Sequence, residues 1–309
     1  MLFKVKPVLA VAFICLIVGS LVAWRIATTP SSPPPLDSRN KISVITSFYP
    51  LFFFASRIAG EHADVTNITP AGAEPHDYEP TPRDMARIER GDLLVLNGAG
   101  LEPWENTIRE VLKNSPIVIV AVGEELARSL HTSEGRDPHV WLNPVLAIEE
   151  IKKIEQALER VDPSSREAYK KNAQALIDEL VILDAHYREG LRTCKKKDII
   201  TSHTAFGYVA AEYGFTQIAL TGLSPDMEPT PKRLVEIADI AREKNIRTIF
   251  FETLVSPRLA QTIAQEIGAQ TRVLNPLEGL TEEDQAKGKD YLTEMENNLT
   301  NLKTALECQ

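Results

Sequence analysis

Residues Asp162–Cys194 read DPSSREAYKKNAQALIDELVILDAHYREGLRTC, and this stretch organises the rest of the chain. Asp162 can cap a helix, and Pro163 fits the first helical position. Apolar side chains then recur at spacings of three and four, the period of one helix face; they are Tyr169, Ala173, Leu176, Leu180, Leu183, Tyr187 and Leu191. The pattern predicts one helix of roughly 30 residues, about 45 Å long at 1.5 Å per residue. We interpret it as a rigid spacer between two domains, with a coiled-coil interaction arm as the alternative.

On both sides of this helix the sequence alternates between strand and helix patterns. Strands are predicted at 41–47, 64–69, 92–96, 117–120, 198–202 and 248–252. Helices are predicted at 49–59, from Thr81 and Pro82 to Gly91, from Ala205 toward Tyr213, from Thr230 and Pro231, and at 290–306. Such alternation is typical of parallel sheets with helices on both faces. The fold class is therefore α/β, with two Rossmann-like lobes joined by one long rigid helix and a cleft between them.

The first 40 residues differ in composition from the rest of the chain. Lys4 and Lys6 precede an apolar run over residues 7–24, and Arg25 closes the run, which predicts export. The run suits either a cleaved signal peptide or an N-terminal membrane anchor. We therefore divide the chain into a signal peptide or anchor (1–27), a Pro/Ser-rich tether (28–40), an N-terminal lobe (41–161), the linker helix (162–196) and a C-terminal lobe (197–309).

Charge and cysteine content limit the possible partners and the compartment. The formal net charge is −9, which argues against nucleic acid and anionic membranes as partners. Cys194 and Cys308 are the only cysteines beyond the leader. In an oxidising compartment they can form a disulfide, and two free thiols are the alternative.

Three of the six histidines follow strand-like stretches: His76, His139 and His203. Loops at the carboxyl ends of parallel strands converge on one crevice, so these imidazoles are predicted to meet there. Three imidazoles indicate a metal site, and zinc is the first candidate. Asp137 supplies a carboxylate close to His139, and Trp141 supplies an apolar wall that excludes water.

The other three histidines lack such settings. His62 lies on a turn that leaves a helix, His131 lies in a polar loop, and His186 lies on the long helix. We interpret all three as solvated.

Three motifs together resemble the metal-binding subunits of bacterial ABC importers. They are PHDYEPT at 75–81, DPHVWLNP at 137–144 and SHTAFGY at 202–208. These subunits are the cluster A-I solute-binding proteins for zinc and manganese, and the resemblance extends from Lys41 to Leu306. It implies two α/β lobes joined by a single long helix. It also implies His76 and His139 as ligands from the first lobe and His203 as a ligand from the second.

The third and fourth ligand positions bear on which metal is bound. Manganese-binding members usually carry a glutamate where this chain has His203, and imidazole-rich ligation suits zinc. At the fourth position many members carry an aspartate, but here the residue is Asn275. The stretch LNPLEG at 274–279 resembles a zinc-binding subgroup in which the glutamate ligates, so Glu278 is expected as the fourth ligand, with a water as the alternative. Glu252 is expected to line the cleft or to have a structural role, rather than to be a ligand.

The resemblance implies an extracytoplasmic, monomeric protein that captures Zn²⁺ and delivers it to an ABC permease in the cytoplasmic membrane. The alternatives are a manganese-binding subunit of the same fold and a metal-dependent surface adhesin. A zinc hydrolase is the rival class, because three histidines also describe a catalytic zinc site. Three histidines and one glutamate would leave no open coordination position, so we predict that the protein is not an enzyme.

Overall fold

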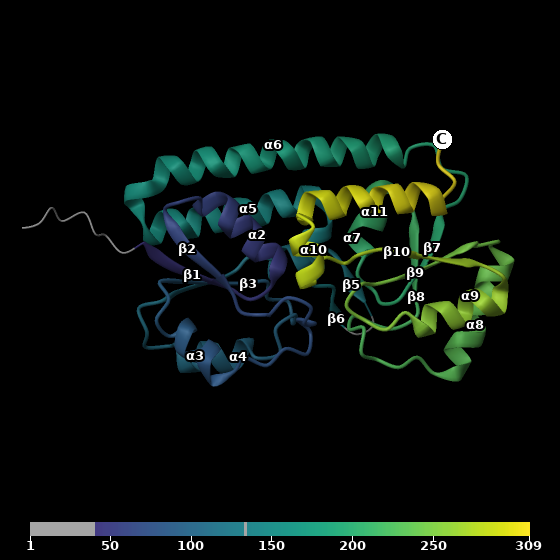
Figure 1. Cartoon of the computed structure of the whole chain (residues 1–309), viewed down its shortest axis with the longest axis horizontal. Helices are drawn as coiled ribbons and strands as arrows, with labels where there is room; N and C mark the ends of the chain where they lie inside the picture. The colour runs from purple at the N-terminus through teal and green to yellow at the C-terminus, as the bar shows by residue number, and fades with distance from the viewer. Residues whose placement is uncertain (1–40, 133–134) are drawn as a thin grey trace, which may run out of the picture. The chain divides into compact units, whose positions relative to one another are not determined.

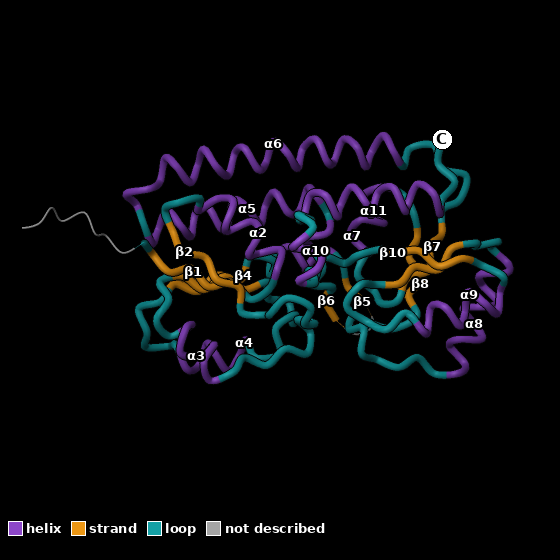
Figure 2. Tube along the Cα trace, in the orientation of Figure 1, coloured by secondary structure: helices purple, strands orange, loops and turns teal. Residues whose placement is uncertain are grey.

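The computed structural model describes residues 41–132 and 135–309 and contains two four-stranded parallel sheets (Figures 1 and 2). The first sheet has the order β2-β1-β3-β4, with strands β1 (Ile42–Thr46), β2 (Ala63–Asn67), β3 (Leu93–Leu96) and β4 (Val118–Ala121). The second has the order β10-β9-β7-β8, with strands β7 (Asp198–Thr201), β8 (Thr216–Ala219), β9 (Thr248–Phe251) and β10 (Gln270–Val273). We call the parts built on these sheets the N-lobe and the C-lobe.

The N-lobe sheet is covered on both faces. Helices α2 (Tyr49–Ala59) and α5 (Pro144–Val161) lie on one face, and α3 (Pro82–Ile88) and α4 (Glu105–Val111) lie on the other (Figure 1). Leu93 and Val95 pack with the first pair, whereas Leu94 and Leu96 pack with the second. A strand that is buried on both faces reads as a continuous apolar run rather than an alternating one, as Leu93–Leu96 does.

The C-lobe repeats this arrangement. Ile200 and Ile249 pack with α8 (Pro231–Glu243) and α9 (Arg258–Ile267), whereas Ile199 and Phe250 share a core with α7 (Gly207–Tyr213) and α11 (Tyr291–Ala305). A short helix, α10 (Glu282–Ala286), precedes α11. Each sheet therefore has a helical layer on either side, as the alternating sequence pattern predicts.

The long helix α6 (Arg166–Gly190) follows a 3₁₀ turn, η3 (Pro163–Ser165). It packs against α2 and α5 of the N-lobe and against α11 of the C-lobe, and its apolar stripe is buried. The prediction of one helix in this region is confirmed, although the α-helix ends at Gly190 rather than near Cys194. Because both lobes cover its apolar stripe, α6 is a spacer and not a free interaction arm.

Three predicted helix starts agree with the observed caps, but the predicted start of the long helix does not, because Asp162 caps the turn η3 and α6 begins at Arg166. The side chains of Thr81, Thr230 and Asp290 accept hydrogen bonds from the first turns of α3, α8 and α11. The strands β8 and β10 were not predicted. Both are four-residue edge strands with polar residues, TQIA and QTRV, so the apolar signal is weak.

Several short elements connect β4 to α5. A two-stranded hairpin, β5 (His131–Thr132) and β6 (Gly135–Arg136), replaces the predicted polar loop. The 3₁₀ turns η1 (Leu126–Ser129) and η2 (Val140–Leu142) lie before and after it.

The predicted leader, anchor and tether at residues 1–40 lie outside the described residues. Across 41–132 and 135–309, no helix combines the length and the apolar character needed to cross a membrane.

A disulfide joins Cys194, just after α6, to Cys308 near the C-terminus. Thr193 reinforces this junction, since its carbonyl accepts from the Gln309 N–H and its hydroxyl donates to the Gln309 carbonyl. Of the two alternatives for these cysteines, the structure contains the disulfide. It ties α11 to the end of the spacer helix.

We predict that Cys308→Ser lowers the free energy of unfolding by about 2–5 kcal/mol, because the bond closes a loop of 114 residues and so restricts the unfolded chain. Urea unfolding with and without a reductant measures this. The reductant should destabilise the native protein by a similar amount and leave Cys308→Ser unchanged. Equal stability of the native and substituted proteins under oxidising conditions would contradict the prediction.

Candidate metal centre

Four side chains from four loops meet between the lobes: His76, His139, His203 and Glu278. His76 lies on the loop after β2, and His139 immediately precedes η2, so both come from the N-lobe. His203 follows β7 and Glu278 follows β10, so both come from the C-lobe. The structure thus brings together the four residues that the sequence analysis named as candidate ligands.

Five of the six separations among their ligand atoms fit a tetrahedral site. The Glu278 Oε1 atom lies 3.3, 3.2 and 3.2 Å from the Nε2 atoms of His76, His139 and His203. The His139 Nε2 atom lies 3.3 Å from that of His76 and 3.2 Å from that of His203. A tetrahedron with metal–ligand distances of about 2.0 Å has edges of about 3.3 Å, and tetrahedral nitrogen and oxygen ligation at this distance is typical of zinc.

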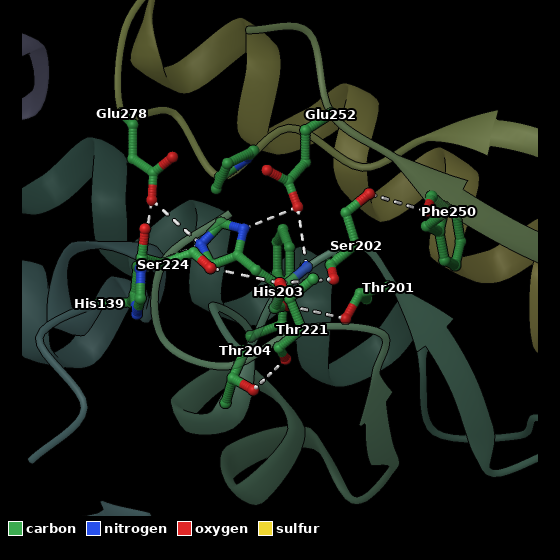
Figure 3. Close-up of polar contacts among 12 residues, drawn as sticks. His139, Thr201, Ser202, His203, Thr204, Thr221, Ser224, Phe250, Glu252 and Glu278 are labelled. Carbon is green, nitrogen blue, oxygen red and sulfur yellow. Dashed lines mark hydrogen bonds and ion pairs between the residues drawn. The ribbon is translucent and has the colours of Figure 1, made fainter. Parts of the chain in front are cut away.

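Two buried carboxylates orient two of the histidines. The Nδ1–H group of His139 donates to Asp137 Oδ1 at 2.7 Å. The Nδ1–H group of His203 donates to Glu252 Oε1 at 2.7 Å (Figure 3). Each bond fixes the proton on Nδ1 and leaves the Nε2 lone pair facing the centre. Asp137 and Glu252 therefore act through the histidines and are not themselves among the four converging groups.

Backbone contacts hold the His203 loop in place. The His203 carbonyl accepts from the Thr201 hydroxyl at 2.9 Å and from the Gln217 side-chain amide at 2.8 Å. The His203 N–H donates to Glu252 Oε1 at 3.2 Å. Glu252 thus binds both the ring and the backbone of this histidine.

The turn before Glu278 is built by Asn275. The Asn275 Oδ1 atom accepts from the Leu277 N–H at 2.9 Å, and Leu277 takes the left-handed conformation at φ 58°. The Trp141 indole N–H donates to the Pro276 carbonyl at 2.8 Å and links this loop to the N-lobe. Asn275 is therefore a structural residue that directs Glu278 toward the histidines, and Trp141 connects the lobes beside the site.

Glu74 is a site residue to which the sequence analysis gave no role. Its Oε1 atom accepts from the His76 N–H at 3.3 Å, and its Oε2 atom is buried without a hydrogen-bond partner. Burial and the charge of Glu278 raise the pKa of Glu74 to about 9. Its place two residues before a candidate ligand was the only signal in the sequence.

The site is buried, and the pKa of each of its four side chains depends on the charges of its neighbours. Burial lowers the pKa of His76, although its hydrogen bond to Glu278 opposes that shift. Burial also acts to lower the pKa of His139 and His203, but the neighbouring carboxylates outweigh it, so the pKa is raised for His139 and raised well above the usual value for His203. Burial acts to raise the pKa of Glu278, but the histidines outweigh it and hold that pKa well below the usual value. Without metal, the site therefore retains protons on imidazole against an ionised carboxylate.

The remaining histidines lie away from this centre. His186 is exposed, as predicted, and its Nδ1 atom lies 2.7 Å from Glu296 Oε1. His62 was predicted to be solvated but is half-buried, because its ring packs edge-on against Tyr169 with centroids 6.1 Å apart. The exposure of the His131 side chain lies outside what the structure describes.

The sequence pattern of the family described as zinc-uptake complex component A, periplasmic (ZnuA), matches residues 44–305. The chain belongs to the ZnuA family. It is 41% identical over 285 residues to the high-affinity zinc uptake system protein ZnuA of Bacillus subtilis, covering 87% of this chain and 89% of that protein. It is 40% identical over 277 residues to the zinc-binding lipoprotein AdcA of Streptococcus pneumoniae, covering 85% of this chain but 55% of AdcA.

A solved structure has the same fold. The zinc-bound ZnuA-like domain of Streptococcus pneumoniae AdcA superposes with a TM-score of 0.76 at 39% identity and covers 86% of this chain and 99% of that domain. Membership of the ZnuA family confirms the predicted two-lobe α/β fold and the role in zinc transport rather than catalysis. It also confirms the expected class of partner, since a component of a zinc-uptake complex acts with a permease.

We predict that Asp137→Asn and Glu252→Gln each weaken zinc binding by about 10–100-fold, because each replaces the carboxylate that holds a histidine ring by a neutral amide, which accepts more weakly and can present its NH2 group instead. Competition against a chelator measures the change. Glu282→Gln is the matched control, since Glu282 is an exposed carboxylate four residues from Glu278. Affinities within twofold of the native protein for both variants would contradict the assigned tautomers.

We predict that zinc binding at pH 7 releases protons, because the raised pKa values of His139 and His203 leave imidazole protons for the metal to displace. Affinity should therefore increase with pH through neutrality and fall as the pH drops. Calorimetry in two buffers with different ionisation enthalpies measures the protons released. Observed heats that are the same in both buffers, before any correction for buffer ionisation, would show that no protons are released and that the metal-free site is already deprotonated.

Proposed function

We propose that this protein captures one Zn²⁺ ion between its lobes outside the cytoplasm and delivers it to the permease of an ABC importer. The four ligands are His76, His139, His203 and Glu278. The observation that carries the proposal is the set of 3.2–3.3 Å separations among their ligand atoms, which suits tetrahedral zinc. Family membership supports the role in uptake.

The composition of the ligand set supports zinc over manganese. Three imidazoles and one carboxylate suit zinc, whereas manganese favours carboxylate and other oxygen ligands and commonly takes six of them. The four groups are buried or nearly so, with side-chain exposures of 8% for His76, 0% for His139, 0% for His203 and 1% for Glu278. Burial of all four favours a closed site that stores and transports the ion without a position for a reacting water.

We also propose that the protein works as a monomer, because both halves of the candidate site come from a single chain. The N-lobe then corresponds to residues 41–161, the linker helix to 162–196 and the C-lobe to 197–309. A leader in residues 1–27, either cleaved or retained as an anchor, would direct the protein to the outer face of the cytoplasmic membrane.

A competition titration on metal-stripped protein tests the proposal. We expect one Zn²⁺ per chain and no displacement by equimolar Mn²⁺. Glu278→Ala should weaken zinc binding by about 100-fold or more, since it removes a ligand as well as the buried negative charge. Glu282→Ala is the control and should bind as the native protein does. Preference for manganese, or normal zinc binding by Glu278→Ala, would reject the proposed ligand set.

Delivery to a permease is tested in cells that lack the gene. We expect the native gene to restore growth in zinc-depleted medium and the Glu278→Ala gene to fail at equal protein abundance. Restored growth with Glu278→Ala would mean that zinc delivery does not depend on this site. Normal zinc-limited growth of the strain without the gene would favour adhesion over transport.

A further inference from the structure

The turn that follows β3 has an unusual backbone. Gly98, Ala99 and Gly100 take positive φ angles of 76°, 56° and 88° in succession. A left-handed conformation is unfavourable for an alanine, so the surroundings must hold this turn in place. We call residues Asn97–Gly100 the β3 turn.

A buried carboxylate, that of Glu102, holds the β3 turn. The Glu102 Oε1 atom accepts from the Asn97 N–H at 2.7 Å and from the Ser47 hydroxyl at 2.6 Å. Its Oε2 atom accepts from the Gly98 N–H at 2.9 Å. Glu102 is only 4% exposed, so these three hydrogen bonds replace its solvation.

The β3 turn also holds the segment that carries His139. The Asn97 side-chain amide donates to the carbonyl of Pro138 at 3.0 Å, directly before His139. The backbone of Gly123 packs closely against the Asn97 side chain. A Cβ atom at position 123 would lie 2.8 Å from Asn97 Oδ1. The position of the His139 backbone therefore depends on Asn97, and the backbone of Asn97 depends on Glu102.

A second connection passes through Glu124. Its Oε2 atom accepts from the Ala99 N–H at 2.6 Å, and its Oε1 atom accepts from Arg136 Nη1 at 2.6 Å. Arg136 directly precedes Asp137, the acceptor of the His139 ring. The β3 turn thus holds the segment from Arg136 to His139 at both of its ends.

The hydrogen bond between Glu102 and Ser47 connects Glu102 to the segment that carries His76. The Ser47 carbonyl accepts from the Thr69 N–H at 3.1 Å and from the Thr69 hydroxyl at 2.7 Å. Thr69 begins the loop that reaches His76. Glu102 is therefore connected through hydrogen bonds to both N-lobe segments that carry candidate ligands, without contacting either histidine.

We infer that Glu102 is a positioning residue for zinc binding, which as an ionised carboxylate fixes the His76 and His139 segments together. This inference rests on the proposed zinc site. It assigns to the N-lobe core a role in zinc affinity beyond that of the ligands and their direct hydrogen-bond partners.

The charge of Glu102 makes this role dependent on pH. Burial raises the pKa of Glu102 to about 7, against the effect of its three hydrogen bonds, and the charge of Glu105 on α4 adds to the increase. From α5 it is faced by Glu150, a buried carboxyl whose own pKa burial raises to about 8 and which Lys153 partly compensates. Protonation of Glu102 would weaken the hydrogen bonds from the Asn97 and Gly98 N–H groups, because a neutral carboxyl is a weaker acceptor than a carboxylate. The ionised form is therefore the one that supports zinc binding.

The role of ionised Glu102 is tested by measuring zinc affinity from pH 6 to pH 8 by chelator competition. The proteins compared are the native protein, Glu102→Gln and Glu150→Gln. At pH 8 we expect Glu102→Gln to bind about tenfold more weakly than the native protein. The ratio should shrink toward pH 6, where native Glu102 is itself largely protonated. Glu150→Gln should stay within twofold throughout, because neither Glu150 oxygen accepts a hydrogen bond in the described structure.

The outcomes separate charge from packing and from the proposed function. A ratio that is constant with pH, or native affinity in Glu102→Gln, would overturn the role of Glu102 while leaving the zinc site intact. Absence of zinc binding by the native protein would instead reject the proposed function. If Glu102→Gln does not fold, Ser47→Ala retains the carboxylate and removes one donor. It should weaken zinc binding by a few fold at pH 7, and unchanged affinity would overturn the inference.

Discussion

Four candidate ligand atoms supplied by two separate lobes lie within 4.8 Å of one another, and the rest of the structure serves to keep them together. Tetrahedral coordination allows only small errors in distance, so the lobes have to be held at one separation. The spacer helix α6 meets this requirement, because it packs against α2 and α5 on one side and α11 on the other. The disulfide between Cys194 and Cys308 then fixes the end of α11 to the segment after that helix.

Direct contacts between the lobes add to this rigidity beside the site. The Trp141 indole donates to the Pro276 carbonyl, and the Tyr208 hydroxyl donates to the Asp137 carbonyl at 2.8 Å. Gly207 allows the close approach, since a Cβ atom there would lie 2.6 Å from the Leu130 side chain. These hydrogen bonds do not involve the converging ligand atoms, so release of an ion is expected to move loops more than whole lobes.

Burial of so many acidic groups explains why the site needs a cation. Glu278, Asp137 and Glu252 are all buried, and an unpaired buried carboxylate is costly. The raised pKa values of His139 and His203 favour protonated imidazoles that offset this charge in the metal-free protein, and a divalent ion would replace those protons with its own charge. The same low-dielectric surroundings extend to Glu102, which connects the fold of the N-lobe to the geometry of its two histidines.

The sequence by itself determined the α/β class, the long helix and the loops that carry the three histidines, because these features depend on local periodicity and on short motifs. Glu278 followed from motif resemblance, which also strengthened the preference for zinc that the three imidazoles indicated. Tertiary structure decided the rest. The edge strands β8 and β10 have little apolar pattern, and their pairing depends on neighbours distant in the chain. Pairing of Cys194 with Cys308, burial of Glu74 and convergence of Glu102 with Ser47 and Asn97 likewise depend on residues far apart in sequence, whose proximity no local pattern records.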